Sequence, residues 1–192
     1  MAHRLGRVLI AQEEIAERVR ELGKAVARDY AGRDPLLVGV LKGAVIFLAD
    51  LIRATDIAAT VDFIGVSSYG TSSRSSGVVK ITSDLSVSIE DRHVLLVEDI
   101  IDTGRTINYL RRNLQTRHPR SLKLCALLDK AERREEEVVI DYLGFSIPNH
   151  FVVGYGLDFE GLYRNLSYIA VLEPDPAAPG GLAALSPELP VL

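Results

Sequence analysis

Hydrophobic positions near the amino-terminal end of the chain repeat with the period of a helix. Over residues 12–30, the apolar residues Ile15, Val19, Leu22 and Val26 are spaced four, three and four positions apart, with charged residues between them. This spacing places apolar side chains on one face of a helix. The pattern therefore predicts an amphipathic helix over residues 12–30.

Short, uninterrupted apolar runs recur along the rest of the chain and alternate with stretches of helical character. The run LLVGVL is typical of a strand buried on both faces, and strands are predicted at 36–41, 61–66, 78–82, 94–97, 122–128 and 138–142. Residues 44–54 and 106–114 are predicted to be helices, and the charged segment AERREEEV at 131–138 a solvated loop or helical turn. Strands that alternate with helices favour an α/β fold with a mostly parallel central sheet flanked by helices.

Two segments lack a regular pattern. Residues 67–77 contain six serines, one threonine and two glycines, which cannot bury enough apolar surface to be rigid. This segment is either a solvated connector or a mobile lid, and we favour the lid because unstructured loops of this length are uncommon in compact domains. Five of the eight prolines lie in residues 174–192, which we expect to be a flexible tail outside a single domain at 1–173.

Composition and charge exclude several classes of protein. The 192 residues include 22 Lys or Arg and 26 Asp or Glu, which gives a formal net charge of -4. An acidic chain without a basic tract is unlike a protein held to nucleic acid by phosphate contacts. Small molecules are therefore the expected partners.

The cysteine and histidine content and the length of the apolar runs exclude further kinds of site and segment. Cys125 is the one cysteine, so neither an intramolecular disulfide nor a cysteine zinc site is expected, and the four histidines show no ligand spacing. The apolar stretch at residues 8–11 is too short for a signal peptide, and no run approaches the ~18 residues of a membrane helix. We expect a cytoplasmic protein that does not associate with membranes.

The strongest chemical signal is the segment VEDIIDTGRT at 97–106. Two adjacent carboxylates at a strand end, Glu98 and Asp99, are costly unless a cation or hydrogen bonds offset their repulsion. The following Asp-Thr-Gly-Arg-Thr supplies hydroxyls, a glycine and backbone N–H groups at a helix start, which suits a phosphate. Helix capping by Asp102 or Thr103 is the alternative, but capping explains neither Glu98 nor Asp99.

This segment is similar to the phosphoribosyl-pyrophosphate motif of the purine phosphoribosyltransferases. The chain resembles the hypoxanthine-guanine members of that family over about residues 5–173, in the same motif order. The further matching segments are Leu41-Lys42-Gly43, Ser67-Ser68-Tyr69-Gly70, Leu128-Asp129-Lys130 and FVVGYGLDFEGLYRNLSYI at 151–169. The resemblance implies the type I phosphoribosyltransferase fold, with a small hood formed by the terminal segments.

The resemblance also implies a reaction and its partners. A 5-phosphoribosyl group would pass from phosphoribosyl pyrophosphate to N9 of hypoxanthine or guanine, giving IMP or GMP and pyrophosphate in purine salvage. The implied cofactor is Mg²⁺, and the implied assembly is a homodimer or homotetramer. The transition state in this family is oxocarbenium-like, so a closing lid that begins at Ser68 and Tyr69 would exclude water.

Specific residues inherit roles toward phosphoribosyl pyrophosphate. Glu98 and Asp99 would approach the ribose hydroxyls and a magnesium ion. The 5′-phosphate would be wrapped by Asp102, Thr103, Gly104, Arg105 and Thr106. A cis peptide between Leu41 and Lys42, followed by Gly43, would meet pyrophosphate together with Arg164.

Other residues inherit roles toward the purine. Asp102 would be the general base at N7, and Lys130 would donate to O6, which selects 6-oxopurines over adenine. Phe151 would stack on the base, and Val152 would contact it through its backbone. Asp158 would lie in the purine site and help to hold a second magnesium ion.

Alternatives remain open on the sequence alone. A regulatory protein of the same fold would bind phosphoribosyl pyrophosphate or nucleotides and control expression through RNA or DNA, but it would need a basic face. Among enzymes, transfer to adenine, orotate or xanthine is the alternative; Lys130 disfavours adenine, while xanthine stays possible.

Overall fold

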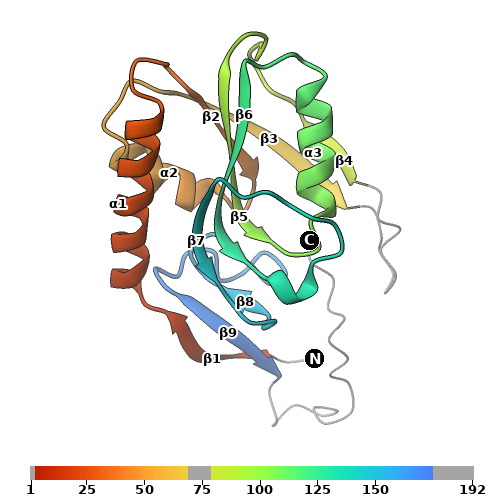
Figure 1. Ribbon diagram of the computed structural model, residues 1–192. Coiled ribbons are helices and arrows are strands. Elements are labelled where there is room, and N and C mark those ends of the chain that lie inside the picture. The colour runs from red at the N-terminus through yellow and green to blue at the C-terminus, as the bar shows by residue number, and fades with distance from the viewer. Residues whose placement is uncertain (1–2, 69–78, 175–192) are drawn as a thin grey trace.

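A six-stranded sheet forms the centre of the protein in a computed structural model that describes residues 3–68 and 79–174 (Figure 1). Its strand order is β4-β3-β2-β5-β6-β7, and every neighbouring pair is parallel except β3 and β4. The strands are β2 (Leu36–Leu41), β3 (Thr60–Ser68), β4 (Val79–Ser83), β5 (His93–Ile101), β6 (Ser121–Asp129) and β7 (Tyr142–Ser146). The predicted mostly parallel sheet is confirmed.

Helices cover both faces of this sheet. The helices α1 (Gln12–Asp29) and α2 (Val45–Ala54) pack on one face, where Leu37 and Leu95 belong to their core, and α3 (Arg105–Gln115) packs on the other, with Leu36 and Leu96 (Figure 1). Successive strand residues point to opposite faces, so a strand between two helical layers must be apolar throughout. The continuous apolar runs in the sequence therefore reflect burial on two sides.

The predicted helices and most strands agree with the structure within a few residues, and a 3₁₀ turn at Ala131–Arg133 lies in the segment predicted to be a loop or helical turn. The strand predicted at 138–142 is wrong: β7 begins only at Tyr142. Val138 and Ile140 instead pack on the α3 side of the core without joining the sheet. Apolar residues at alternate positions, here Val138 and Ile140, indicate that one side of the segment is buried. An irregular segment can bury one side in the same way as a strand.

A second, three-stranded sheet forms the hood. It has the order β1-β9-β8, with β1 (His3–Ile10), β9 (Ile169–Pro174) and β8 (Val152–Val153) all antiparallel. Figure 1 shows it beyond the end of the central sheet at which β5 and β6 finish. The hood brings the two ends of the described chain to the edge of the sheet where ligands of parallel sheets bind.

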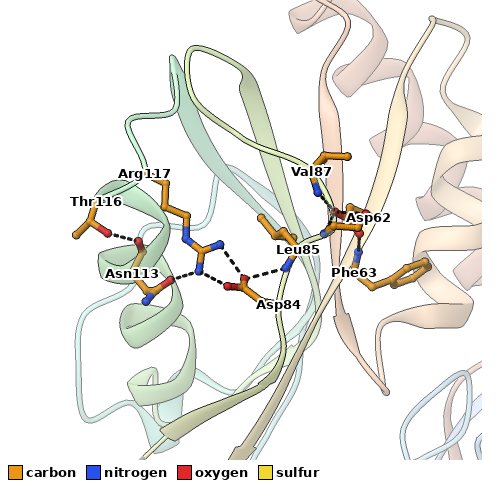
Figure 2. Close-up of polar contacts among 9 residues, drawn as sticks. Asp62, Phe63, Asp84, Leu85, Val87, Asn113, Thr116 and Arg117 are labelled. Atoms are coloured by element: carbon orange, nitrogen blue, oxygen red, sulfur yellow. Dashed lines mark hydrogen bonds and ion pairs between the residues drawn. The ribbon is translucent and has the colours of Figure 1, made fainter.

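The link from β4 to β5 is fixed by two aspartates, as Figure 2 shows. Asp62 accepts hydrogen bonds from the backbone N–H groups of Phe63 at 2.8 Å, Ser86 at 2.7 Å and Val87 at 3.3 Å. Asp84 pairs with Arg117, which follows α3, at 2.7 Å. Asp62 therefore holds the link against β3, and Asp84 holds it against the end of α3.

The next features are the single cysteine, the length of the helices and the predicted tail. Cys125 is fully buried in β6, and burial raises the pKa of its thiol, which fits a small core residue. No helix within residues 3–68 and 79–174 is long and apolar enough to cross a membrane. Pro174 ends β9, and the remaining residues of the predicted tail lie outside the described chain.

Candidate active site

The ends of β2 and β5 bring a glycine turn and a carboxylate together. The Leu41–Lys42 peptide is cis, as expected, and the turn continues through Gly43 into α2. A Cβ atom on Gly43 would lie 1.6 Å from Oδ2 of Asp99, so only glycine fits here. The backbone of the turn therefore lies directly against the acidic end of β5.

Glu98 and Asp99 form an acidic pair within β5 itself. Burial raises the pKa of Glu98 well above its usual value, and the neighbouring Asp99 charge adds to this effect. Burial likewise raises the pKa of Asp99 to about 6, although hydrogen bonds and the more distant Arg164 charge oppose it. Oε2 of Glu98 is buried without a hydrogen-bond partner among the described residues. Such a pair is a fitting place for a hard divalent cation with oxygen ligands.

The protein groups in this region do not complete a metal site by themselves. Within the described residues, no three histidine, cysteine or carboxylate side chains cluster at metal-binding distance. Magnesium commonly binds through one or two carboxylates together with substrate phosphates and water, so the pair Glu98–Asp99 still fits it. Asp158 lies apart from this pair and contacts Arg164 instead, with 2.5 Å between Oδ1 and Nη2.

Asp102 and Lys130 are buried beside each other where β5 and β6 end. The residues are 8% and 5% exposed, and Nζ of Lys130 lies 4.0 Å from Oδ2 of Asp102. Burial lowers the pKa of Lys130, and the Asp102 charge partly offsets this. Neither carboxylate oxygen of Asp102 has a hydrogen-bond partner among the described residues. The pair thus presents a buried carboxylate with unused acceptor capacity beside a buried ammonium.

A third charged residue, Arg133, joins this pair and was not found from the sequence. Its Nε lies 3.3 Å from Oδ1 of Asp102. The 3₁₀ turn after β6 brings it there, because the Arg133 N–H donates to the Lys130 carbonyl at 3.0 Å. The three-residue spacing from Lys130 was the available signal, but it lay in a run of charges that is typical of a solvated surface.

Residues 102–106 form the loop that leads into α3. Gly104 caps the helix with φ of 88°, and a Cβ atom there would lie 2.5 Å from the Glu136 carbonyl oxygen. The loop is held from behind, because Glu135 and Glu136 donate their N–H groups to the Thr103 carbonyl at 3.0 and 3.1 Å. The amino-terminal end of α3, which begins at Arg105 and Thr106, is thereby fixed, and such ends attract anions.

The predicted purine-binding stretch lies in the hood and reaches back to the core. The Phe151 carbonyl accepts a hydrogen bond from the Leu172 N–H at 2.8 Å, and Val152 begins β8. Arg164 donates to the Gly156 carbonyl at 2.6 Å. A Cβ atom on Gly156 would lie 2.1 Å from the Gly43 carbonyl oxygen, so the hood touches the cis-peptide turn.

Of the two predicted lid residues, Ser68 and Tyr69, only Ser68 belongs to the described chain. Ser68 ends β3, which pairs with β4 through Val79. Tyr69 lies outside the described residues. Among the other predicted site residues, the structure brings Gly43 against Asp99 and Lys130 against Asp102, and it brings the segment that contains Gly156 against the Gly43 turn.

Comparison with known proteins gives a consistent result. The family model described as "Phosphoribosyl transferase domain" matches residues 9–160. A hypoxanthine-guanine phosphoribosyltransferase of Mycobacterium avium is 52% identical over 173 residues, which cover 87% of this chain and 85% of that protein. The bifunctional protein TilS/HprT of Listeria monocytogenes is 50% identical over 175 residues, 91% of this chain, but the chain spans only 27% of its length.

A solved structure supports the same relationship. The crystal structure of a hypoxanthine phosphoribosyltransferase from Staphylococcus aureus matches with a TM-score of 0.85 and 45% sequence identity. The match covers 88% of this chain and 92% of that one. The likeness therefore extends over the central sheet and the hood together.

Proposed function

Because the chain belongs to the hypoxanthine-guanine phosphoribosyltransferase family, we propose that it transfers a 5-phosphoribosyl group from phosphoribosyl pyrophosphate to N9 of hypoxanthine or guanine. The bond from C1 of the ribose to the pyrophosphate oxygen breaks, and a bond from C1 to N9 forms. The products are pyrophosphate and IMP or GMP. The observation that carries the proposal is the buried Asp102–Lys130 pair beside the amino-terminal end of α3.

The purine is recognised by the two members of that pair. A 6-oxopurine offers an acceptor at O6 for Lys130, while Asp102 faces N7 and takes up the proton that the base loses as the new bond forms. Adenine carries an amino group at the position of O6, so it would leave the Lys130 ammonium without an acceptor. A site built around a hydrogen bond rejects analogues that leave its buried groups unpaired.

The phosphoribosyl group is held by backbone groups on two sides. The loop 102–106 receives the 5′-phosphate at the amino-terminal end of α3, where Gly104 lets the chain turn. The turn of Leu41, Lys42 and Gly43, together with Arg164, meets the pyrophosphate. Phe151 and the Val152 backbone contact the base from the hood, and closure of the segment that starts at Ser68 and Tyr69 keeps water from the oxocarbenium-like centre.

Magnesium completes the charge balance of this site. Glu98 and Asp99 would hold one magnesium ion and Asp158 would help to hold a second, and these ions would supply positive charge that offsets the negative charge of the leaving pyrophosphate. The protein's part is to hold the two carboxylates of β5 in place. Oε2 of Glu98, which is buried without a hydrogen-bond partner among the described residues, supports this assignment.

The experiment that tests the function is a direct assay of nucleotide formation. The purified chain is mixed with magnesium, phosphoribosyl pyrophosphate and, in turn, hypoxanthine, guanine, xanthine or adenine, and the products are separated by chromatography. We expect IMP and GMP, with little AMP. No nucleotide from any of the four bases would contradict the proposal, and tight binding without turnover would favour a regulatory protein.

The assembly belongs to the same proposal. Members of this family are expected to act as oligomers, and we propose a homodimer or a homotetramer for this chain. Light scattering on the purified protein gives its mass directly, and a monomer at assay concentration would contradict this part alone.

A further inference from the structure

Three aromatic side chains of the hood form a row that ends at Phe151, the residue assigned to the purine. The ring centroids of Phe151 and Phe159 lie 5.6 Å apart at an interplanar angle of 88°. The Phe159 ring in turn lies 4.5 Å from the His3 imidazole, tilted by 54°. Edge-to-face and tilted contacts at such separations are favourable, so the rings restrain one another. His3 has no role in the proposed reaction so far.

Both ends of this row are anchored on the same strand. His3 lies opposite Pro174 in the β1–β9 pair, and the Phe151 carbonyl accepts the Leu172 N–H at 2.8 Å. The positions of His3 and Phe151 are therefore fixed relative to β9. Phe159 fills the space between them, although it comes from neither strand.

The backbone around Phe159 is held by its own turn. Phe159 and Leu162 exchange two backbone hydrogen bonds, at 3.2 and 2.9 Å, and the Gly161 N–H donates to Oδ2 of Asp158 at 2.7 Å. Loss of the His3 ring would thus leave this turn closed. Without the His3 ring, the Phe159 ring would be free to rotate, and its edge-to-face contact with Phe151 would be weakened.

The His3 ring acts here through its shape. Nδ1 of His3 is buried and has no hydrogen-bond partner among the described residues, so no polar contact of this atom within residues 3–68 and 79–174 explains its place. An aromatic ring without nitrogen would make the same contact with Phe159 and bury no unpaired polar atom. A phenylalanine at position 3 therefore tests the packing of the ring separately from any proton transfer by the imidazole.

We propose that His3 is a positioning residue for the purine: it holds Phe159 against Phe151, so that the Phe151 ring keeps the orientation in which it stacks on the base. The inference rests on the proposed function, because Phe151 is assigned to the base there. It adds a residue from β1 to the determinants of base binding, although β1 supplies none of the groups that touch substrate.

The test compares His3→Ala with His3→Phe. We expect His3→Ala to raise the KM for hypoxanthine roughly three- to tenfold, the range of a lost aromatic contact, while the KM for phosphoribosyl pyrophosphate changes less than about twofold. His3→Phe is expected to restore the KM for hypoxanthine. Calorimetric titration with IMP gives a second reading that needs no turnover, and its Kd should follow the same order.

The matched control is Arg4→Ala on the same strand. Arg4 is exposed and pairs with Glu173 at 3.3 Å, and as the next residue of the strand it points to the opposite face from His3, so its loss should leave both KM values unchanged. An unchanged KM for hypoxanthine in His3→Ala, an equal rise for both substrates, or no rescue by His3→Phe would each overturn the inference. Lack of nucleotide formation by the unaltered protein would instead overturn the proposed function, so the two failures are distinguishable.

Discussion

Two opposite charges buried side by side dominate the site at the scale of single residues. Asp102 and Lys130 are each less than a tenth exposed, yet the carboxylate has no hydrogen-bond partner among the described residues. Burying a charge without hydrogen bonds is costly, and the Lys130 ammonium at 4.0 Å and the Arg133 guanidinium at 3.3 Å offset only part of that cost. A purine that supplies an acceptor for one group and a protonated ring nitrogen for the other would remove this cost. The site therefore favours a base with both features.

Asp102→Asn tests the role of the carboxylate as a base. The amide has almost the same shape but cannot take up a proton, so kcat should fall by roughly 10² to 10⁴, as for other general bases. Steady-state kinetics with hypoxanthine measures it. Asp91→Asn, at an exposed carboxylate paired with Arg120, is the control and should keep normal turnover. A near-normal kcat in Asp102→Asn would remove the assignment.

Lys130→Gln tests the choice between oxo and amino bases. A glutamine amide can donate to O6 or accept from a 6-amino group, so it removes the discrimination that a charged donor provides. The ratio of kcat/KM for hypoxanthine to that for adenine should fall by roughly one to two powers of ten, the scale of one buried hydrogen bond. Competition between the two bases in one reaction measures this ratio, and an unchanged ratio would place O6 recognition elsewhere.

At the scale of elements, the start of α3 depends on a single glycine. Gly104 has φ of 88° and no room for a Cβ atom, which would lie 2.5 Å from the Glu136 carbonyl oxygen. Gly104→Ala should therefore weaken phosphate binding and lower the free energy of unfolding by roughly 1–3 kcal/mol. Urea unfolding and the KM for phosphoribosyl pyrophosphate measure the two effects.

Gly32→Ala is the matched control for that substitution. Gly32 also has a positive φ, 69°, but nothing lies within 4 Å of its Cβ position. It should share the backbone strain but not the steric clash, and it should leave the KM for phosphoribosyl pyrophosphate unchanged. Equal effects of the two substitutions on that KM would show that the close approach to Glu136 has no part in phosphate binding.

The β3–β4 edge owes part of its stability to the buried carboxylate of Asp62. Burial alone would raise its pKa, but hydrogen bonds from Phe63, Ser86 and Val87 outweigh burial and lower the pKa below the usual value of an aspartate. Because the folded pKa is the lower one, the stabilisation is present above about pH 4 and is lost as the pH falls through the folded pKa. Acid should therefore weaken this edge of the sheet.

Asp62→Asn should flatten that dependence. The free energy of unfolding, measured in urea from pH 7 down to pH 2.5, should fall less steeply in the variant than in the unaltered protein. The variant should also be less stable at pH 7, because an amide makes weaker hydrogen bonds with the same N–H groups. Parallel pH curves for the two proteins would show that Asp62 contributes nothing to the acid sensitivity.

At the scale of the whole molecule, the central sheet was predictable and the hood was not predictable from periodicity. Strands such as β2 are buried on both faces, so the sequence carries an unbroken apolar run there. In β1 the exposed Leu5 and Val8 blur the alternation, and β8 has two residues, so neither gives a clear local pattern. The hood was expected only through the family resemblance.

The site residues likewise divide into those that the sequence pattern predicts and those that it does not. Lys130 stands two residues after a predicted strand, whereas Asp102 stands five residues after one and directly follows β5 only because β5 extends to Ile101. Arg133 reaches Asp102 through a 3₁₀ turn, and His3 reaches Phe159 through the register of β1 with β9. Such contacts depend on tertiary geometry, which the spacing of residues along the chain does not encode.

The hood and the central sheet meet closely at one pair of glycines, which offers a test of their coupling. Gly156 has φ of 102°, and a Cβ atom there would lie 2.1 Å from the Gly43 carbonyl oxygen in the cis-peptide turn. Gly156→Ala must therefore move the hood away from the turn that we propose meets pyrophosphate. We expect loss of most activity and a stability lower by roughly 1–3 kcal/mol, with the central sheet still folded.

Hydrogen exchange separates local from global effects of this substitution. In Gly156→Ala, the amides of β8 and β9 should exchange faster, while those of β5 and β6 should change much less, because only the contact between the two sheets is altered. Gly161→Ala is the control, since Gly161 has φ of 83° but open space at its Cβ position. It should leave the exchange of β8 and β9 unchanged. If Gly156→Ala kept both its activity and the slow exchange of the hood, the hood would hold its catalytic position without this contact.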